Sequence, residues 1–311
     1  MSKYQLSAQK LNTYQKLPFE TKLALTNQRI EKALGLYKKP LVSSSFGKDS
    51  TVLIHLVMQH TKDFDVVHNE TGVELPTDVP FRDFLVKEWD LKLHIVKPKM
   101  TFWDCVKKYG YPRDSRFSKT GDSHPACCVH LKELPMKRFI KSHDFDLDFV
   151  GLLADEGRQR RWAYIRAGCC IYEHKKWGIT KCIPLIWWNE ADIWTYIQKF
   201  GLPVNPAYEK YGISRTGCLP CTGFISWEKS MAKTNPKMLR HILKDRYGQV
   251  QLGDFTKSLP TPIPRDSSQG GEKMAKETPE EFAKRVNAEA KARAKKREGI
   301  GVGVVGFGVK I

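Results

Sequence analysis

Residues 45–50 read Ser45-Phe46-Gly47-Lys48-Asp49-Ser50, and this stretch decides the fold that we predict. A short apolar run at 40–44 precedes it and is typical of a buried strand. The apolar spacing over 49–59 predicts a helix directly after it. A glycine-containing turn between a strand and a helix N-terminus presents backbone N–H groups to an anion. The stretch therefore predicts a phosphate-binding loop.

Each side chain in this loop suits phosphate chemistry. Gly47 lets the backbone approach a phosphate, and Lys48 adds a positive charge. Ser45 and Ser50 add hydroxyl donors, while Asp49 suits helix capping or Mg²⁺ binding. The loop lacks the four-residue spacer between glycines that defines a Walker loop.

Strand and helix patterns alternate outward from this loop. Strands are expected at 40–44, 64–68, 91–96, 149–153 and 181–186, and helices at 20–38, 49–59, 81–89, 102–109, 131–142 and 191–200. This alternation predicts an α/β fold with a doubly wound parallel sheet. We expect three parts: an N-terminal helical segment (1–39), a phosphate-loop domain (40–230) and a basic C-terminal extension (231–311). The extension is expected to be partly flexible, with a linker at 253–271 and a helix at 278–297.

Charge and composition point to an anionic partner. The 311 residues carry 52 Lys and Arg against 34 Asp and Glu, for a formal net charge of +18. Residues 97–141 hold eleven basic residues against four acidic ones, and 158–181 hold seven against one. Aromatic residues lie among them, including Trp162, Tyr164 and Trp177, which favours nucleic-acid binding over small anions alone. The N-terminus lacks the apolar core of a signal peptide and no apolar stretch suits a membrane, so we expect a cytoplasmic protein.

Eight cysteines are many for a chain expected in a reducing compartment. Two groups stand out, the adjacent pair Cys127-Cys128 and the motif Cys218-Leu-Pro-Cys221. Adjacent cysteines suit tetrahedral zinc poorly, whereas a [4Fe–4S] cluster offers irons that are further apart. A [4Fe–4S] cluster is the leading interpretation, with zinc and redox-active thiols as alternatives. The pair at 169–170 is a competing ligand pair.

Five ordered motifs resemble the phosphoadenosine phosphosulfate (PAPS) reductase family of PP-loop ATP pyrophosphatases. They cover about residues 40–225: Ser-x-Gly-x-Asp-Ser at 45–50, Asn-Glu-Thr-Gly-Val-Glu-Leu-Pro at 69–76, Gly-Leu-Leu-Ala-Asp-Glu at 151–156 with Arg158 and Arg161, the segment 183–194, and 202–221 ending in Arg-Thr-Gly-Cys-Leu-Pro-Cys. The resemblance implies an adenine nucleotide alpha hydrolase-like fold. It also implies that Ser45, Phe46, Gly47, Lys48, Asp49, Ser50, Thr71, Gly72, Arg158 and Arg161 bind the nucleotide. The cysteine set is similar to that of iron–sulfur adenylyl-sulfate reductases.

The resemblance leaves the reaction open. Reductases of the family use a late cysteine in a Glu-Cys-Gly segment, and none follows Cys221 here. The loop contains Lys48, and the ATP-using relatives that act in DNA phosphorothioation and tRNA thiolation have a lysine there too. We therefore expect ATP and Mg²⁺, with Lys48 and Asp49 as catalytic residues, nucleic acid as acceptor and a cysteine desulfurase as sulfur donor. The alternatives are a sulfite-releasing reductase, a subunit like that of sulfate adenylyltransferase, and a non-catalytic nucleotide-binding module.

Overall fold

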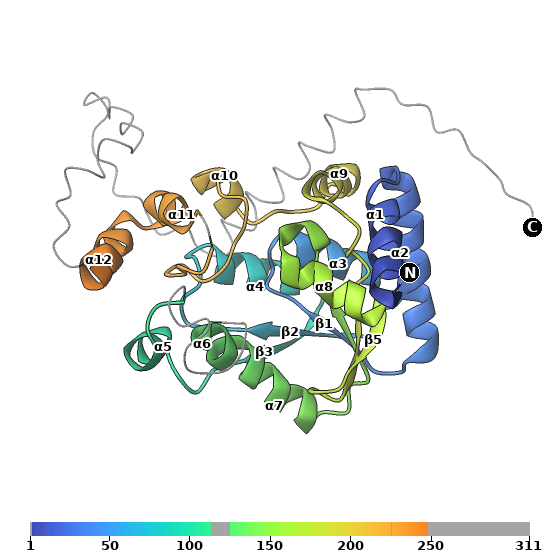
Figure 1. Cartoon of the computed structure of the whole chain (residues 1–311), viewed down its shortest axis with the longest axis horizontal. Helices are drawn as coiled ribbons and strands as arrows, with labels where there is room; N and C mark the ends of the chain where they lie inside the picture. Colours follow the sequence, from blue (N-terminus) through green and yellow to red (C-terminus); the bar gives the residue numbers. More distant parts are fainter. Residues whose placement is uncertain (1, 113–124, 225, 248–311) are drawn as a thin grey trace, which may run out of the picture.

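The computed structural model describes residues 2–112, 125–224 and 226–247 and contains the predicted sheet. Six strands lie in the order β3-β2-β1-β4-β6-β5 (Figure 1). The strands are β1 (Pro40–Ser43), β2 (Asp65–Asn69), β3 (Lys92–Val96), β4 (Leu147–Val150), β5 (Ile171–His174) and β6 (Ile179–Cys182). The first four strands and β6 pair in parallel, whereas β5 runs antiparallel to β6 at one edge. The sequence patterns did not predict β5, which pairs antiparallel because a tight turn joins it to β6 without a crossover helix.

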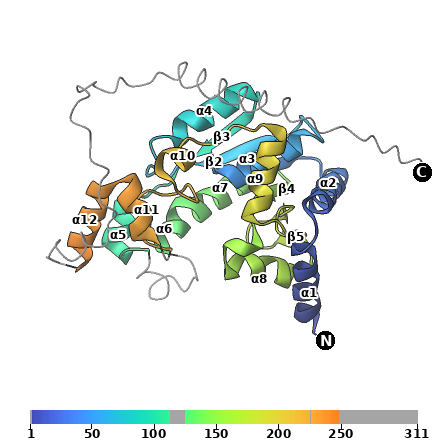
Figure 2. The same cartoon turned by 90° about the horizontal axis from the view of Figure 1, so that it is seen from above.

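Helices cover both faces of the sheet (Figures 1 and 2). They are α1 (Lys3–Gln15), α2 (Phe19–Leu36), α3 (Lys48–Met58), α4 (Asp78–Glu88), α5 (Phe102–Tyr109), α6 (Ala126–Cys128), α7 (Leu134–Ser142), α8 (Arg158–Ala167), α9 (Glu190–Phe200), α10 (Ala207–Tyr211), α11 (Trp227–Thr234) and α12 (Pro236–Tyr247). A π-helical turn, Val129–Glu133, joins α6 to α7. The doubly wound sheet predicted from the sequence is confirmed.

The alternation of side chains along β1 explains the two layers. Val42 packs into the large core that also holds residues of α2, α3, α4 and α9. Its neighbour Leu41 points to the other face and packs with Met136 and Ile140 of α7. Both β1 residues are completely buried, so each face of the central strand belongs to a core.

The N-terminal helices are fastened to the body of the domain. Lys22 of α2 forms a buried ion pair with Asp192 of α9, with Nζ 2.7 Å from Oδ2. Thr26 donates to the Pro184 carbonyl at 3.0 Å and accepts from the indole N–H of Trp188 at 2.9 Å. Both α1 and α2 pack as part of the same core as the rest of the domain.

Several expected boundaries shift by one to three residues, and two of the differences have a clear physical reason. The strand expected at 181–186 is β6 at 179–182, because Pro184 has no N–H for a ladder and the chain turns at 183–188. The domain limit between residues 230 and 231 falls inside α11, whose Trp227 and Met231 pack in one cluster with Tyr111. The linker at 253–271 and the helix at 278–297 lie outside the described residues. Within the part of the chain that is described, no helix is long and apolar enough to cross a membrane.

Candidate nucleotide and thiol site

The predicted phosphate loop lies where β1 ends and α3 begins, at the point where the strand order reverses. β2 flanks β1 on one side and β4 on the other, so a crevice opens at their carboxyl ends. Phe46 adopts a positive φ of 53°, which is uncommon for a residue other than glycine. Its side chain is buried beside His68, and its backbone N–H donates to Ser44 Oγ at 3.0 Å. Phe46 therefore anchors the loop in the core.

Gly47 is required by close packing. A Cβ at this position would lie 2.8 Å from Thr216 Oγ1 and 3.3 Å from the hydroxyl of Tyr208. Tyr208 also accepts a hydrogen bond from the backbone N–H of Lys48 at 3.0 Å. The segment that carries Tyr208 and Thr216 thus lies directly on the loop.

A cavity of about 370 Å³ opens above the loop. Its lining includes Ser45, Gly47, Asp49 and Ser50 of the loop and Thr71 after β2. Further lining residues come from the carboxyl end of β4, the start of α8 and the segment 215–218. The cavity joins the loop, β2 and β4 as expected for a ligand at the switch point of an α/β sheet.

Asp49 faces this cavity with an unsatisfied oxygen. Its Oδ1 is buried without a hydrogen-bond partner among the described residues, while Oδ2 lies 3.5 Å from Lys48 Nζ. Burial raises the pKa of Asp49 above its usual range, and the nearby charges of Lys48 and Arg160 oppose this rise. A carboxylate oxygen left open in a phosphate cavity is a suitable ligand for a divalent cation.

The sequence predicts that Lys48 binds phosphate, but its side chain lies away from the cavity. Its buried ammonium donates to the Ser214 carbonyl at 3.0 Å and lies 3.5 Å from Glu190 Oε1. The residues that line the cavity include Asp49 but not Lys48. In this structure Lys48 holds the 214–218 segment against the loop.

The other expected nucleotide ligands divide between the cavity and its surroundings. Thr71 lines the cavity, whereas Gly72 does not and instead forms the turn after it with a φ of 78°. Arg158 and Arg161 are not among the lining residues. Arg161 contacts Asn12 and Gln15 of α1, because its position on α8 faces that helix.

Two other arginines, Arg160 and Arg215, line the cavity. The sequence analysis did not single out Arg160, although it lies one position before Arg161 on the same helix. No signal in the sequence separates Arg160 from Arg161, because α8 lacks a regular apolar stripe that would show which of its sides faces inward.

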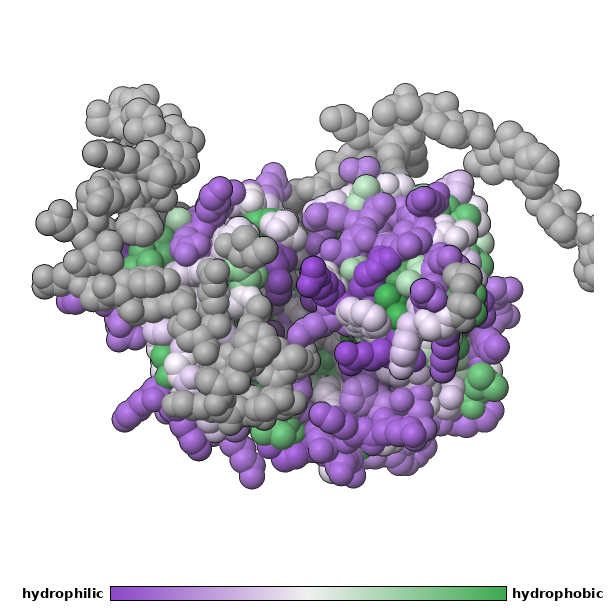
Figure 3. All heavy atoms as spheres, in the orientation of Figure 1, coloured by the Kyte–Doolittle hydropathy of each residue, from purple (hydrophilic) through white to green (hydrophobic). Residues whose placement is uncertain are grey.

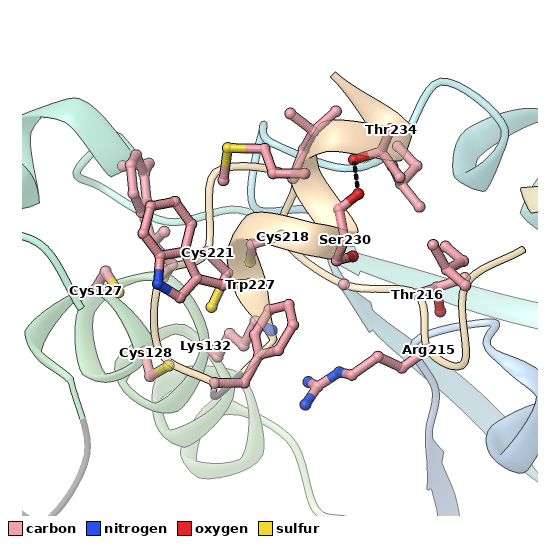
Figure 4. A pocket seen from close by; sticks show the side chains of 18 residues that line it. Cys127, Cys128, Lys132, Arg215, Thr216, Cys218, Cys221, Trp227, Ser230 and Thr234 are labelled. Atoms are coloured by element: carbon pink, nitrogen blue, oxygen red, sulfur yellow. Dashed lines mark hydrogen bonds between the residues drawn. The ribbon is translucent and has the colours of Figure 1, made fainter. Parts of the chain in front are cut away.

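The four cysteines of the predicted cluster site line a neighbouring pocket (Figure 4). Cys127 and Cys128 come from α6, and Cys218 and Cys221 come from the loop after α10. The loop is tied to the segment after β2 by a hydrogen bond from the Leu219 N–H to the Val73 carbonyl at 2.7 Å. Folding thus brings together two pairs of cysteines that are about 90 residues apart in the sequence.

The thiols influence one another and a nearby cation. Interaction with the Cys128 thiol, burial and the neighbouring Cys221 and Cys218 all raise the pKa of Cys127. Negative charge on Cys218, and then on Cys128 and Cys221, raises the pKa of Lys132. Among the described residues, no three His, Cys, Asp or Glu side chains are arranged to hold a single metal ion.

The pocket lined by the four cysteines (the four-thiol pocket) and the cavity above the loop, where the sequence predicts a nucleotide (the nucleotide cavity), share a wall. Five residues line both: Lys132, Arg215, Thr216, Gly217 and Cys218. Thr71 Oγ1 lies 3.8 Å from Cys218 Sγ, so the two sites meet at this thiol. A group held by the four cysteines would lie directly beside a bound nucleotide.

The remaining cysteines lie elsewhere. Burial raises the pKa of Cys105 and of Cys170 to about 11, and it also raises that of Cys182. Cys169 is exposed and lines a different cavity between α1, α2 and β5. The pair at 169–170 therefore does not join the four-thiol pocket.

Comparison with known proteins defines the class of this fold and site. A sequence model described as the phosphoadenosine phosphosulfate reductase domain matches residues 39–224. This chain belongs to that family, and the resemblance seen in the sequence is confirmed at this level.

Individual relatives are distant. Adenosine 5′-phosphosulfate reductase 1 of Bacillus subtilis is 28% identical over 193 residues, which cover 61% of this chain and 76% of the relative. An uncharacterised protein of Methanocaldococcus jannaschii is 28% identical over 197 residues. That match covers 61% of this chain and 44% of the relative, so this chain spans less than half of its length. Among solved structures, PAPS reductase from Candida auris in a phosphate complex has a TM-score of 0.48 at 22% identity, covering 62% of this chain and 87% of that one.

Proposed function

We propose that this chain is an ATP pyrophosphatase that adenylates an acceptor on nucleic acid so that sulfur can replace an oxygen. The observation that carries the proposal is the shared wall between the nucleotide cavity and the four-thiol pocket. This wall would put an activated acceptor and a sulfur-holding site within one continuous space.

The loop supplies groups for the leaving pyrophosphate. Its backbone amides, the α3 N-terminus and the hydroxyls of Ser45 and Ser50 all suit phosphate oxygens. The open Oδ1 of Asp49 would hold a Mg²⁺ ion, which would help to stabilise the charge of the leaving pyrophosphate. The acceptor oxygen would attack the α-phosphorus while the bond to pyrophosphate breaks, and the developing charge would fall on these donors. A sulfur nucleophile would then displace AMP together with that oxygen.

Lys48 takes part in this proposal mainly as a positioning residue. Its ammonium holds the Ser214 carbonyl, and its backbone N–H holds the hydroxyl of Tyr208. Both contacts fix the segment that roofs the loop. Lys48 would contact a phosphate only by exchanging its bond to Ser214.

The four-thiol pocket fits a [4Fe–4S] cluster by its donor set. Four sulfurs from two segments line one pocket of about 100 Å³, walled by the completely buried Trp227. Lys132 would offset the negative charge of the thiolates. A cluster is proposed rather than zinc because the adjacent pair Cys127-Cys128 suits tetrahedral zinc poorly. Bound there, a [4Fe–4S] cluster would hold sulfur beside the nucleotide.

The sulfur donor proposed for this reaction is a cysteine desulfurase. The exposed side of the four-thiol pocket would receive sulfur from such a protein, since Cys128, Cys218 and Cys221 are only partly buried. The net charge of +18 and the basic runs support a polyanionic acceptor.

A reductase that releases sulfite from an adenosine phosphosulfate is the second candidate, favoured by one observation. Cys218 lines the nucleotide cavity, and it is the only cysteine among the described residues that does so. A thiolate at Cys218 would attack the sulfur atom and release the adenosine phosphate. That role would compete with ligation by the same atom.

Pyrophosphate release from ATP tests the proposed function. We expect Asp49→Asn to abolish it, because the variant loses the carboxylate that faces the cavity. Asp63→Asn is the matched control, since Asp63 is exposed on a loop after α3. Unchanged release in Asp49→Asn would remove this carboxylate from the mechanism.

A further inference from the structure

Two packed helices, α1 and α8, carry positive charge without any acidic residue. They lie side by side in both views of the molecule (Figures 1 and 2), and their contact is direct. Hydrophilic side chains cover most of the face of the molecule seen in Figure 3, with hydrophobic ones scattered among them. The basic residues on the two helices are Lys3, Lys10, Arg158, Arg160, Arg161 and Arg166.

One face of α8 combines exposed arginines with an exposed aromatic ring. Arg158, Trp162 and Arg166 are spaced four residues apart, so they lie on one side of the helix over about 12 Å. All three are exposed, and Trp162 keeps 44% of its surface accessible. Tyr164 of the same helix is buried in the core, so Trp162 and not Tyr164 is accessible to a ligand. We call Arg158, Trp162, Arg166 and the neighbouring Tyr4 the α8 stripe.

The rings and cations of the α8 stripe are arranged for stacking. The Arg166 guanidinium carbon lies 5.9 Å from the centroid of the Trp162 ring. The ring of Tyr4, which is 52% exposed, meets Trp162 edge-on at 6.4 Å. Neither Arg158 nor Arg166 forms an ion pair with a carboxylate among the described residues.

The acidic residues closest in sequence to the stripe are engaged elsewhere. Asp155 accepts a hydrogen bond from Gln15, and Glu156 pairs with Arg160. The positive charge of the stripe is therefore not neutralised by its immediate neighbours.

The α8 stripe lies on a helix that also contributes to the nucleotide cavity. Arg160 of α8 lines that cavity, as does Glu156 just before the helix, whereas the stripe residues do not line it and lie on another side of α8. We propose that the stripe binds an unpaired stretch of nucleic acid and guides it toward the cavity, with one base stacked on Trp162 and phosphates on the two arginines. Base pairing hides base faces in a duplex, whereas an unpaired strand offers them to an exposed ring. This inference rests on the proposed function, because it names where the acceptor would bind.

Fluorescence anisotropy with a labelled single-stranded RNA of mixed sequence tests the inference on the anaerobically purified full chain. Loss of one stacked base predicts that Trp162→Ala weakens binding by about 5- to 150-fold. Trp162→Phe keeps an aromatic ring and should retain most of the affinity. Phe200→Ala, which removes a ring that is 43% exposed on α9, is the matched control and should bind as the parent does.

Salt dependence separates the arginines from the ring. Removing one phosphate contact predicts that Arg166→Ala makes the negative slope of log K against log salt shallower by about 0.7, as for single strands. Trp162→Ala should leave that slope unchanged. Lys87→Ala on α4 is the charge-matched control and should alter neither quantity.

Three results would overturn the inference: equal binding of the RNA by Trp162→Ala and the parent, equal binding of a duplex of the same sequence, or stronger binding of polyglutamate than of RNA. ATP pyrophosphate release is measured in parallel on the parent protein. RNA binding that depends on Trp162 without pyrophosphate release would contradict the proposed function alone. Pyrophosphate release with no effect of Trp162→Ala would contradict the α8 stripe alone.

Discussion

Replacing Gly47 by alanine tests whether the phosphate loop and the segment that roofs it form one packed unit. The new Cβ would lie 2.8 Å from Thr216 Oγ1, whereas ordinary contact begins at 3.4 Å. Thr216 would have to retreat by 0.6 Å, the difference between these two distances, to restore ordinary contact. The same Cβ would also press on the hydroxyl of Tyr208, which accepts the Lys48 N–H.

The expected cost has two parts. Overpacking of a close contact costs about 1–3 kcal/mol, and disturbing one hydrogen bond adds about 0.5–1.5 kcal/mol. We therefore expect Gly47→Ala to lower the free energy of unfolding by about 1.5–4.5 kcal/mol. We also expect weaker ATP binding, because the displaced segment lines the nucleotide cavity.

Urea denaturation followed by circular dichroism measures the stability, and isothermal titration calorimetry measures ATP binding. Gly35→Ala is the control, since nothing lies within 4 Å of its Cβ and Gly35 is on an exposed turn of α2. That variant should gain about 0.5–1 kcal/mol from helix propensity. A Gly47→Ala protein that matched the parent in both stability and ATP affinity would refute the close packing described above.

Three further predictions concern the core, a buried acid and the thiols. Lys22→Met should lower the free energy of unfolding by about 3–5 kcal/mol in urea, because Asp192 would keep a buried charge without its partner. Burial raises the pKa of Asp78 to about 6, so the folded state binds more protons than the unfolded state between about pH 4 and pH 6. The parent should therefore lose stability relative to Asp78→Asn as the pH rises through this window, by about 2–3 kcal/mol; a constant difference would contradict the raised pKa. Cys218→Ser should lose the visible absorbance of an anaerobically reconstituted cluster while Cys169→Ser keeps it, and retained colour in Cys218→Ser would reassign the ligands.

Periodic apolar patterns predicted most of the fold. The helix expected at 102–109 is α5 with the same bounds, and the strand expected at 40–44 is β1 at 40–43. α5 buries one regular face, and β1 is a short apolar run that is buried on both faces, so burial leaves a readable pattern in the sequence in each case. The phosphate loop was found for the same reason, since its type follows from a strand, a glycine turn and a helix.

Helices without an apolar stripe were missed. Only Ser7 and Leu11 of α1 are buried, and α8 carries arginines along its length, so neither helix shows an apolar period. The rotation of α8 about its axis is set by its packing on α1. The sequence could not show that rotation, and Arg161 was therefore chosen where Arg160 lines the cavity.

Long-range packing decided the rest of the site. The sequence paired Cys127-Cys128 with the Cys218 motif by chemistry, and the fold places them around one pocket. It did not reveal that Lys48 would be held by the Ser214 carbonyl, because that contact joins residues 166 positions apart. Local patterns carry no information about such a contact.

The products released by anaerobically purified protein test the central claim most directly. One sample would receive ATP with single-stranded nucleic acid, a second ATP with sulfate, and a third an adenosine phosphosulfate with a thiol reductant. The account predicts pyrophosphate in the first sample, increased by the nucleic acid, and no sulfite in the third. Sulfite in the third sample, without nucleic-acid-dependent pyrophosphate in the first, would contradict it and assign the chemistry to Cys218 as a nucleophile.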